Sequence, residues 1–411
     1  MFAKAASKGT AILMSTIIAF TNNSSGQDLE EAINDYQQSL IEQEITGSNV
    51  VMIFKEGKKV YHQTVQSGLT GDQAIEEETI FPIWSMSKPI TTVAMMMLHE
   101  EGKLNWDDEV SKFLPCFQSL TWRDGETIRP CTQPLKIIHL MTHRSGWTYD
   151  KIENGIDEGG VPNVAFDSIY PNQTRFNDLQ SYVESCAKTP LAFEPGTKYL
   201  YGMNQGIQGR LIEVISGRPL EEFLQQRIFE PLGMTDTGFS MTPTQRERFQ
   251  PLFINTGHLK GFTYLLDEMT YQTDSRAHFG DAGLVSTMED YSRFCEMLVS
   301  GGQFRGKRII TPESIATMTK KWSSGFPEEP NAFPELEGHY NGFSLFVLED
   351  PSKKETRVPR GIYGWAGYHN THFWIDPENE IFGLFMSRTR PFNWEIPIGL
   401  RNVVYGNLLE R

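Results

Sequence analysis

The segment that decides the fold is Phe81–Leu104, with the sequence FPIWSMSKPITTVAMMMLHEEGKL. An uninterrupted run of helix-compatible, mostly apolar residues follows SMSK, and this run predicts a helix that ends at Gly102. Pro89 falls in the first turn, where its missing N–H is not needed. We therefore expect Ser85 at the helix N-terminus and Lys88 one turn further, on the same face.

This arrangement suits a nucleophilic serine. The hydroxyl of Ser85 becomes a good nucleophile when a base takes its proton, and the amine of Lys88 can do so if it is desolvated and neutral. The positive end of the helix dipole also favours a developing oxyanion. The segment therefore predicts an acyl-transfer site at the start of the helix.

A second S-x-x-K sequence runs from Ser185 to Lys188. It lies near the end of a predicted helix, so Ser185 is at the negative pole of the dipole. We interpret this copy as a solvated last turn without catalytic function.

Composition limits the classes of partner. The 411-residue chain has 37 basic and 52 acidic residues, a net charge of −15, and no basic run. This balance argues against binding to nucleic acid or to anionic membrane surfaces. The length and the 39% hydrophobic content suit one large domain or two interleaved domains.

The N-terminus resembles a secretory signal peptide. Lys4 and Lys8 precede an apolar run over Thr10–Phe20, and no acidic residue occurs before Asp28. We predict a signal peptide over residues 1–26, a periplasmic or secreted mature protein and no membrane span after cleavage. A disordered tail and an uncleaved anchor are the alternatives, although the apolar run is short for a bilayer span.

Four cysteines are compatible with export without requiring it. Cys116 and Cys131 flank a turn-rich segment and could form a disulfide, whereas Cys186 and Cys295 lie in helical patterns and are expected as buried thiols. The absence of C-x-x-C spacing argues against a zinc site.

Two histidines lie four residues apart on the predicted helix Leu135–His143. His139 and His143 have the spacing of H-E-x-x-H, but Leu140 stands where that motif needs Glu. We expect helix packing or capping from them. No metal and no cofactor are predicted.

The order of elements predicts an α/β (α+β) fold, in which an antiparallel sheet is flanked by helices and a mainly helical domain is inserted. Residues 27–80 and 281–411 would form the discontinuous α/β domain, and residues 81–280 the helical domain with the nucleophile. The expected helices are Leu29–Ile45, Leu179–Lys188, Gln205–Ile215, Met288–Ser300, Thr311–Thr319 and Asn402–Glu410. The expected strands are Asn49–Lys55, Lys59–Gln63, Gly342–Val347, Gly361–Trp365, Thr371–Ile375 and Ile381–Ser387.

Further motifs make the site specific. SMSKP at Ser85 is similar to the S-x-S-K-x of class C β-lactamases and related serine esterases. The sequence LMTHRSG over residues 140–146, PGT at Pro195 with Tyr201 six residues later, and YGWAG at Tyr363 resemble three further motifs of that branch in the same order. The similarity runs from about Leu40 to Thr389. It implies the β-lactamase/transpeptidase-like fold of the serine β-lactamase and penicillin-binding-protein superfamily.

The resemblance also implies roles. Ser85 would be acylated, Lys88 would be its base, and Tyr201 would share that proton and return it to the leaving group. The backbone N–H groups of Ser85 and Tyr368 would form the oxyanion hole.

Two departures from the β-lactamase pattern concern the substrate. The usual K-T-G is Trp365-Ala366-Gly367 here, so an aromatic ring replaces the cation that pairs with a substrate carboxylate. The usual Y-x-N ends in Met203, although Asn204 could partly restore the amide contact. We assign these five residues to substrate binding, and the pattern is similar to family VIII carboxylesterases and related acyltransferases.

We therefore predict a serine hydrolase that cleaves or transfers acyl groups of neutral, small-molecule carboxylic esters through an acyl-enzyme. The alternatives are a β-lactamase or D-amino-acid peptidase and, from another class, a catalytically silent relative that binds a ligand or cell-wall fragment. A Ser-His-Asp hydrolase is disfavoured because no G-x-S-x-G sequence occurs.

Overall fold

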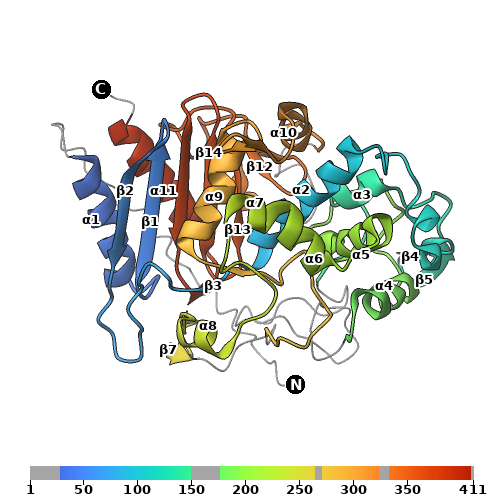
Figure 1. Ribbon diagram of the computed structural model, residues 1–411, viewed down its shortest axis with the longest axis horizontal. Helices are drawn as coiled ribbons and strands as arrows, with labels where there is room; N and C mark the ends of the chain where they lie inside the picture. Colours follow the sequence, from blue (N-terminus) through green and yellow to red (C-terminus); the bar gives the residue numbers. More distant parts are fainter. Residues whose placement is uncertain (1–27, 150–175, 264–270, 324–332, 409–411) are drawn as a thin grey trace, which may run out of the picture.

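A seven-stranded antiparallel sheet forms one half of the molecule (Figure 1). The computed structural model describes residues 28–149, 176–263, 271–323 and 333–408. The strands, in sheet order, are β11 (His339–Asn341), β12 (Phe346–Leu348), β13 (Tyr363–Gly367), β14 (Thr371–Asp376), β15 (Ile381–Met386), β1 (Asn49–Lys55) and β2 (Lys58–Val65).

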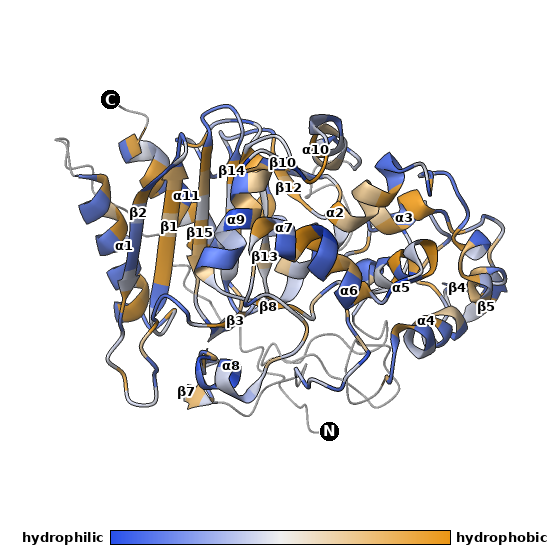
Figure 2. Ribbon diagram, viewed as in Figure 1, coloured by the Kyte–Doolittle hydropathy of each residue, from blue (hydrophilic) through white to orange (hydrophobic). Residues whose placement is uncertain are grey.

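The two ends of the chain meet inside this sheet. Strand β1 pairs with β15, and Val51 lies opposite Phe385. All six residues of β15 and six of the seven in β1 are buried, as expected for strands covered on both faces. In Figure 2 these two strands are almost entirely in the hydrophobic colours.

Helices cover the sheet. Helix α1 (Leu29–Glu42) packs against α11 (Glu395–Leu408), and the Tyr36 hydroxyl of α1 donates to the Ile396 carbonyl at 2.8 Å. Helix α9 (Met288–Val299) packs against β14 and β15. Figure 1 shows α1 and α11 together at one end of the molecule and most of the remaining helices at the other.

Helix α2 (Ser87–Glu100) is the central helix of the other half. Every residue from Ser87 to Leu98 is buried, and the helix packs against α5 (Asn204–Ser216). Gly102 follows it with φ +68°, the left-handed conformation that commonly ends a helix. The predicted helix is confirmed.

The remaining elements are short. The helices are α3 (Ile137–Met141), α4 (Leu179–Lys188), α6 (Leu220–Leu224), α7 (Glu230–Leu232), α8 (Pro243–Glu247) and α10 (Pro312–Thr319), with a π-helical turn at Gln225–Phe229. The 3-10 turns are η1 (Trp84–Met86), η2 (Val110–Lys112), η3 (Pro115–Phe117) and η6 (Pro334–Leu336). The short strands pair as β3 (Phe81–Pro82) with β8 (Val285–Ser286), β4 (Thr121–Asp124) with β5 (Thr127–Pro130), β9 (Gln303–Phe304) with β10 (Lys307–Arg308), and β6 (Leu252–Asn255) with both β7 (Lys260–Thr263) and β16 (Thr389–Arg390).

Most predicted elements differ from the observed ones by one to three residues at an end, and three differ more. Helix α3 is shorter than Leu135–His143, because Lys136 forms a β-bridge with Glu109 and His143 has φ +53°. The strand predicted at Gly342–Val347 begins only at Phe346, since residues 342–345 turn the chain between β11 and β12.

The C-terminal helix begins seven residues earlier than predicted, at Glu395. Pro397 lies in its first turn, where a proline is compatible with the helix.

All four cysteines are free thiols. The disulfide considered between Cys116 and Cys131 is therefore not present, and partial burial raises the pKa of the Cys131 thiol to about 11. Cys186 and Cys295 are fully buried, as predicted.

Candidate active site

The turn η1 places Ser85 directly before helix α2. Strand β3 pairs with β8 and leads into this turn, in which Trp84 has φ +45°. A left-handed tryptophan is unusual and needs support from its surroundings. Here the buried indole N–H donates to His369 Nδ1 at 2.9 Å, which anchors the residue before the nucleophile.

The amine of Lys88 is fully buried and has three neighbours. Its Nζ lies 3.0 Å from Ser85 Oγ, 2.7 Å from the Tyr149 hydroxyl and 2.7 Å from the Asp281 carbonyl oxygen. The carbonyl can only accept a hydrogen bond, and the Tyr149 hydroxyl donates its own proton to Asp281 Oδ2 at 2.7 Å. A neutral amine would thus give its two N–H groups to these acceptors and direct its lone pair at Ser85.

The hydroxyl of Tyr201 approaches the nucleophile from another side, 2.8 Å from Ser85 Oγ. Lys88 Nζ also lies 4.9 Å from the centre of the Tyr201 ring. A Cβ on Gly202 would collide with the backbone of Trp147 and Thr148, so glycine permits the close approach of the two segments. Tyr201, 116 residues from Ser85 in the chain, therefore joins Ser85 and Lys88 at one site.

His143 packs against the Tyr201 side of this site. Its ring centre lies 5.0 Å from that of Tyr201, and its backbone carbonyl accepts a hydrogen bond from the Leu200 N–H. Burial lowers the pKa of His143 well below its ordinary value, and the Lys88 charge acts in the same direction. A neutral His143 fits the observed contacts, in which Nδ1 accepts from Asn204 at 2.8 Å and Nε2 lies 3.1 Å from Ser344 Oγ.

Of the two histidines expected to pack on or cap the predicted helix, His139 does so, whereas His143 lies beyond the end of α3. His139 Nδ1 accepts a hydrogen bond from the Lys136 backbone N–H and caps α3. Among residues 28–149, 176–263, 271–323 and 333–408, no group of three His, Cys, Asp or Glu side chains could hold a metal ion.

The contacts of Asn204 do not favour a substrate contact for this residue. Its side chain is fully buried, with Nδ2 directed at His143 and Oδ1 accepting from the Ser145 hydroxyl. Both ends of the amide are therefore occupied by protein. Met203, the other residue predicted for this part of the site, is also fully buried.

Strand β13 runs beside η1 and ends at Gly367, one residue before Tyr368. A Cβ on Gly367 would overlap the carbonyl oxygen of Ile83 and the hydroxyl of Thr371. Glycine is therefore required for the strand to approach the turn that carries Ser85. This approach is compatible with an oxyanion hole built from the N–H groups of Ser85 and Tyr368.

Trp365 is packed inside an aromatic cluster. It is 1% exposed, and its ring centre is 5.6 Å from Tyr201, 6.0 Å from Phe333 and 6.1 Å from Trp394. The indole thus packs against the tyrosine that contacts Ser85. Ala366, next to it, is buried as well.

Sequence reasoning missed Tyr149 and Asp281. Tyr149 follows the end of α3, and Asp281 lies in the loop before β8, within a run of small residues. Each is a single residue in a loop without periodicity. Only their contacts with Lys88 single them out.

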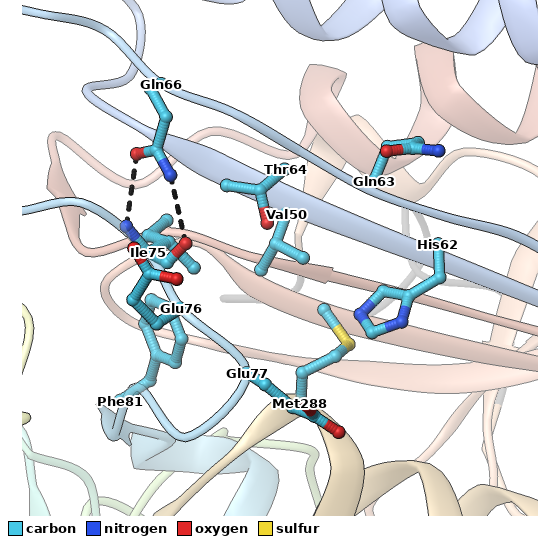
Figure 3. Close-up of a pocket in the computed structure, with 10 residues that line it drawn as sticks. All are labelled: Val50, His62, Gln63, Thr64, Gln66, Ile75, Glu76, Glu77, Phe81 and Met288. Atoms are coloured by element: carbon cyan, nitrogen blue, oxygen red, sulfur yellow. Dashed lines mark hydrogen bonds between the residues drawn. The ribbon is translucent and has the colours of Figure 1, made fainter.

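The second S-x-x-K sequence forms the last turn of α4, as predicted. A separate cavity of about 450 Å³ lies at the β2 edge of the sheet (Figure 3). His62 and Thr64 of β2, Glu76, Phe81 and Met288 contribute to its lining, and it shares no residue with the contacts around Ser85.

Comparisons with known proteins identify the family. The beta-lactamase family matches residues 31–404, nearly the whole chain. The chain belongs to the beta-lactamase family. This confirms the fold and the serine-hydrolase class expected from the motifs.

The relatives include named esterases. Esterase EstB of Burkholderia gladioli is 26% identical over 394 residues, covering 90% of this chain and 93% of EstB. The lovastatin esterase of Penicillium rubens is 26% identical over 384 residues, covering 85% of this chain and 90% of that protein. The structure of EstCE1, a hydrolase with promiscuous acyltransferase activity, superposes with a TM-score of 0.76 at 24% identity, over 92% of this chain and 98% of EstCE1.

Within the part of the chain that the structure describes, no helix has the length and apolar character needed to cross a membrane. The signal peptide predicted for residues 1–26 lies outside the described residues.

Proposed function

We propose that this member of the beta-lactamase family is a serine esterase that acts on neutral carboxylic esters through an acyl-enzyme on Ser85. The observation that carries the proposal is the position of Ser85 Oγ, 3.0 Å from Lys88 Nζ and 2.8 Å from the Tyr201 hydroxyl. A hydroxyl between a buried amine and a phenol can lose its proton to one group while the other is ready to protonate a leaving group.

The proposed reaction has two halves. Lys88 takes the Ser85 proton as Oγ attacks the ester carbonyl, and the backbone N–H groups of Ser85 and Tyr368 stabilise the oxyanion. Tyr201 then protonates the leaving alkoxide. The acyl-enzyme is released by water or by a second alcohol, so hydrolysis and acyl transfer share the same first half.

Esters are favoured over β-lactams because of strand β13. Its sequence, YGWAG, has no basic residue to pair with a substrate carboxylate, and the Trp365 indole fills the space beside Tyr201. The relatives EstB and lovastatin esterase, which are named esterases, support the same choice.

The test is to measure turnover of a series of p-nitrophenyl acyl esters beside a chromogenic cephalosporin. We expect hydrolysis of short-chain esters and little or no cephalosporin hydrolysis. An enzyme that hydrolyses the cephalosporin faster would contradict the ester proposal and favour a β-lactamase. Turnover of neither, with no labelling of Ser85, would favour a silent relative.

We also propose that the protein is exported and that a signal peptide is cleaved near residue 26. The apolar run at Thr10–Phe20 supports export. N-terminal sequencing of the protein recovered outside the cytoplasm tests this proposal.

We further propose that the mature chain is divided into an α/β domain (27–80 and 281–411) and a helical domain (81–280). Limited proteolysis of the mature chain tests this division.

A further inference from the structure

A line of hydrogen bonds leads from the nucleophile into the interior. It runs from Ser85 Oγ to Lys88 Nζ, then to the Tyr149 hydroxyl, and ends at Asp281 Oδ2, with steps of 3.0, 2.7 and 2.7 Å. Tyr149 is partly buried and Asp281 is completely buried. The line therefore connects a reactive hydroxyl to a carboxylate that is shielded from water.

The donors and acceptors allow this line to run in two directions. With Asp281 ionised, Tyr149 donates to the carboxylate, Lys88 donates to Tyr149, and the amine lone pair faces Ser85. With Asp281 protonated, each bond reverses, and Lys88 presents an N–H to Ser85. The first state accepts the Ser85 proton, and the second has a proton to return.

We propose that Tyr149 and Asp281 are positioning residues that relay the Ser85 proton from Lys88 to the buried carboxylate, a proposal that rests on the proposed function. Ser85 gives its proton to Lys88 as the O–C bond to the acyl group forms. Lys88 gives a proton to Tyr149, and the Tyr149 proton passes to Asp281 Oδ2. Lys88 and Tyr149 end neutral, Asp281 has gained a proton, and the negative charge has moved to the oxyanion.

The surroundings of Asp281 suit a proton acceptor. Burial raises the pKa of Asp281, whereas the charge that Lys88 has when it is protonated, and the Tyr149 hydrogen bond, lower it. The other titratable groups that interact with it are Tyr182 and Cys186 of α4. Within the described part of the chain, Oδ1 has no hydrogen-bond partner, and a buried carboxylate in that condition favours protonation.

The experiment measures the rate of fluorophosphonate labelling of Ser85 against pH in the full-length enzyme and in Asp281→Asn, Tyr149→Phe and the double variant. Asparagine keeps the shape and the acceptor oxygen but cannot take a proton. We expect each single variant to be labelled about 10²-fold more slowly or worse. The rate of the parent should rise with pH as Asp281 ionises, and Asp281→Asn should lack this rise.

Residues of one relay should also be non-additive, so we expect the double variant to be no slower than the slower single variant. Tyr182→Phe is the matched control, because its buried hydroxyl lies near Asp281 but outside the line of hydrogen bonds. It should keep the labelling rate and pH profile of the parent. Thermal midpoints show which variants fold. If Asp281→Asn does not fold, the labelling rate and pH profile of Tyr149→Phe test the relay.

The relay is overturned if folded Asp281→Asn keeps the labelling rate and pH profile of the parent. It is also overturned if the losses of labelling rate in the two single variants add up in the double variant. A parent that is labelled but turns over no ester contradicts only the ester function, since the labelling profile still tests the relay. A parent that is not labelled at any pH overturns both.

Discussion

Ser85 and Ser185 occur in the same four-residue pattern but have different surroundings. Ser85 precedes a buried helix and contacts both Lys88 and Tyr201, whereas Ser185 lies near the C-terminal end of α4. The dipole of a helix favours an oxyanion only at its N-terminus. We therefore propose different functions for the two serines on the basis of their positions and contacts, and not of the pattern itself.

We predict that Ser85→Ala abolishes ester turnover and fluorophosphonate labelling, because the attacking oxygen is removed. Ser185→Ala is the matched control and should retain both. Labelling that survives in Ser85→Ala would show that another residue is the nucleophile. The measurements are intact mass after labelling and initial rates with a p-nitrophenyl ester.

Substitutions at Lys88 distinguish a role of its positive charge from a role as a base. Lys88→Arg keeps a positive charge, but a guanidinium does not deprotonate in proteins. We expect Lys88→Arg to be as inactive as Lys88→Ala, with kcat lowered by about 10²–10⁴ if the amine acts as the base. A substantially active Lys88→Arg enzyme would refute the base role.

At the scale of elements, strand β13 and turn η1 approach each other through Gly367. We expect Gly367→Ala to push the strand away from Ile83, displace the Tyr368 N–H and lower kcat by about 10²–10³, the typical effect of losing one oxyanion donor. Gly238→Ala is the control, since a Cβ there would have ordinary van der Waals room. An unchanged kcat in folded Gly367→Ala would show that β13 does not position a donor of the oxyanion hole.

The burial of Trp365 gives a further prediction at this scale. A lysine introduced there would lie among the rings of Tyr201, Phe333 and Trp394, with its charge removed from water. We expect Trp365→Lys to lower the thermal midpoint and ester turnover together without creating cephalosporin hydrolysis. Trp365→Phe, which keeps an aromatic ring, should retain most of both properties. Efficient cephalosporin hydrolysis by folded Trp365→Lys would contradict this expectation and show that a side chain at this position reaches the substrate.

On the scale of the whole molecule, a buried ion pair joins the C-terminal helix to the loop before β13. Arg401 of α11 donates two hydrogen bonds to the Glu355 carboxylate, at 2.6 and 2.7 Å, and both side chains are fully buried. Burial alone would raise the pKa of Glu355, but Arg401 and His339 lower it to about 2.

We predict that Glu355→Gln lowers the free energy of unfolding by about 3–5 kcal/mol, because the Arg401 charge stays buried without its partner. Glu337→Gln, at a half-exposed pair with Lys353, should change it by at most about 1 kcal/mol. Equal small effects of the two substitutions would contradict the role of the buried pair.

The sign of the pH dependence follows from the lowered pKa. The stabilisation from Glu355 is fully present above its unfolded pKa, near 4.5, and is lost as pH falls towards 2. Urea unfolding between these pH values should therefore show a loss of stability in the parent that is smaller in Glu355→Gln.

The sequence by itself determined the features that depend on local patterns. The apolar run after SMSK predicted helix α2, and the alternation of apolar and turn residues predicted β1, β14 and β15 nearly to the residue. Motif order then led to the family. These patterns predict elements well because the periodicity of a helix or strand depends on residues that are close in the sequence.

Only the tertiary structure decided which side chains meet. Lys88 contacts Tyr149 from 61 residues away and Asp281 from 193, and neither partner belongs to a periodic segment. Asn204, which the motif placed towards the substrate, is instead engaged by His143 and Ser145. A local pattern indicates whether a residue is buried, but the partner of a buried polar group depends on how distant segments pack, because burial without a partner is costly.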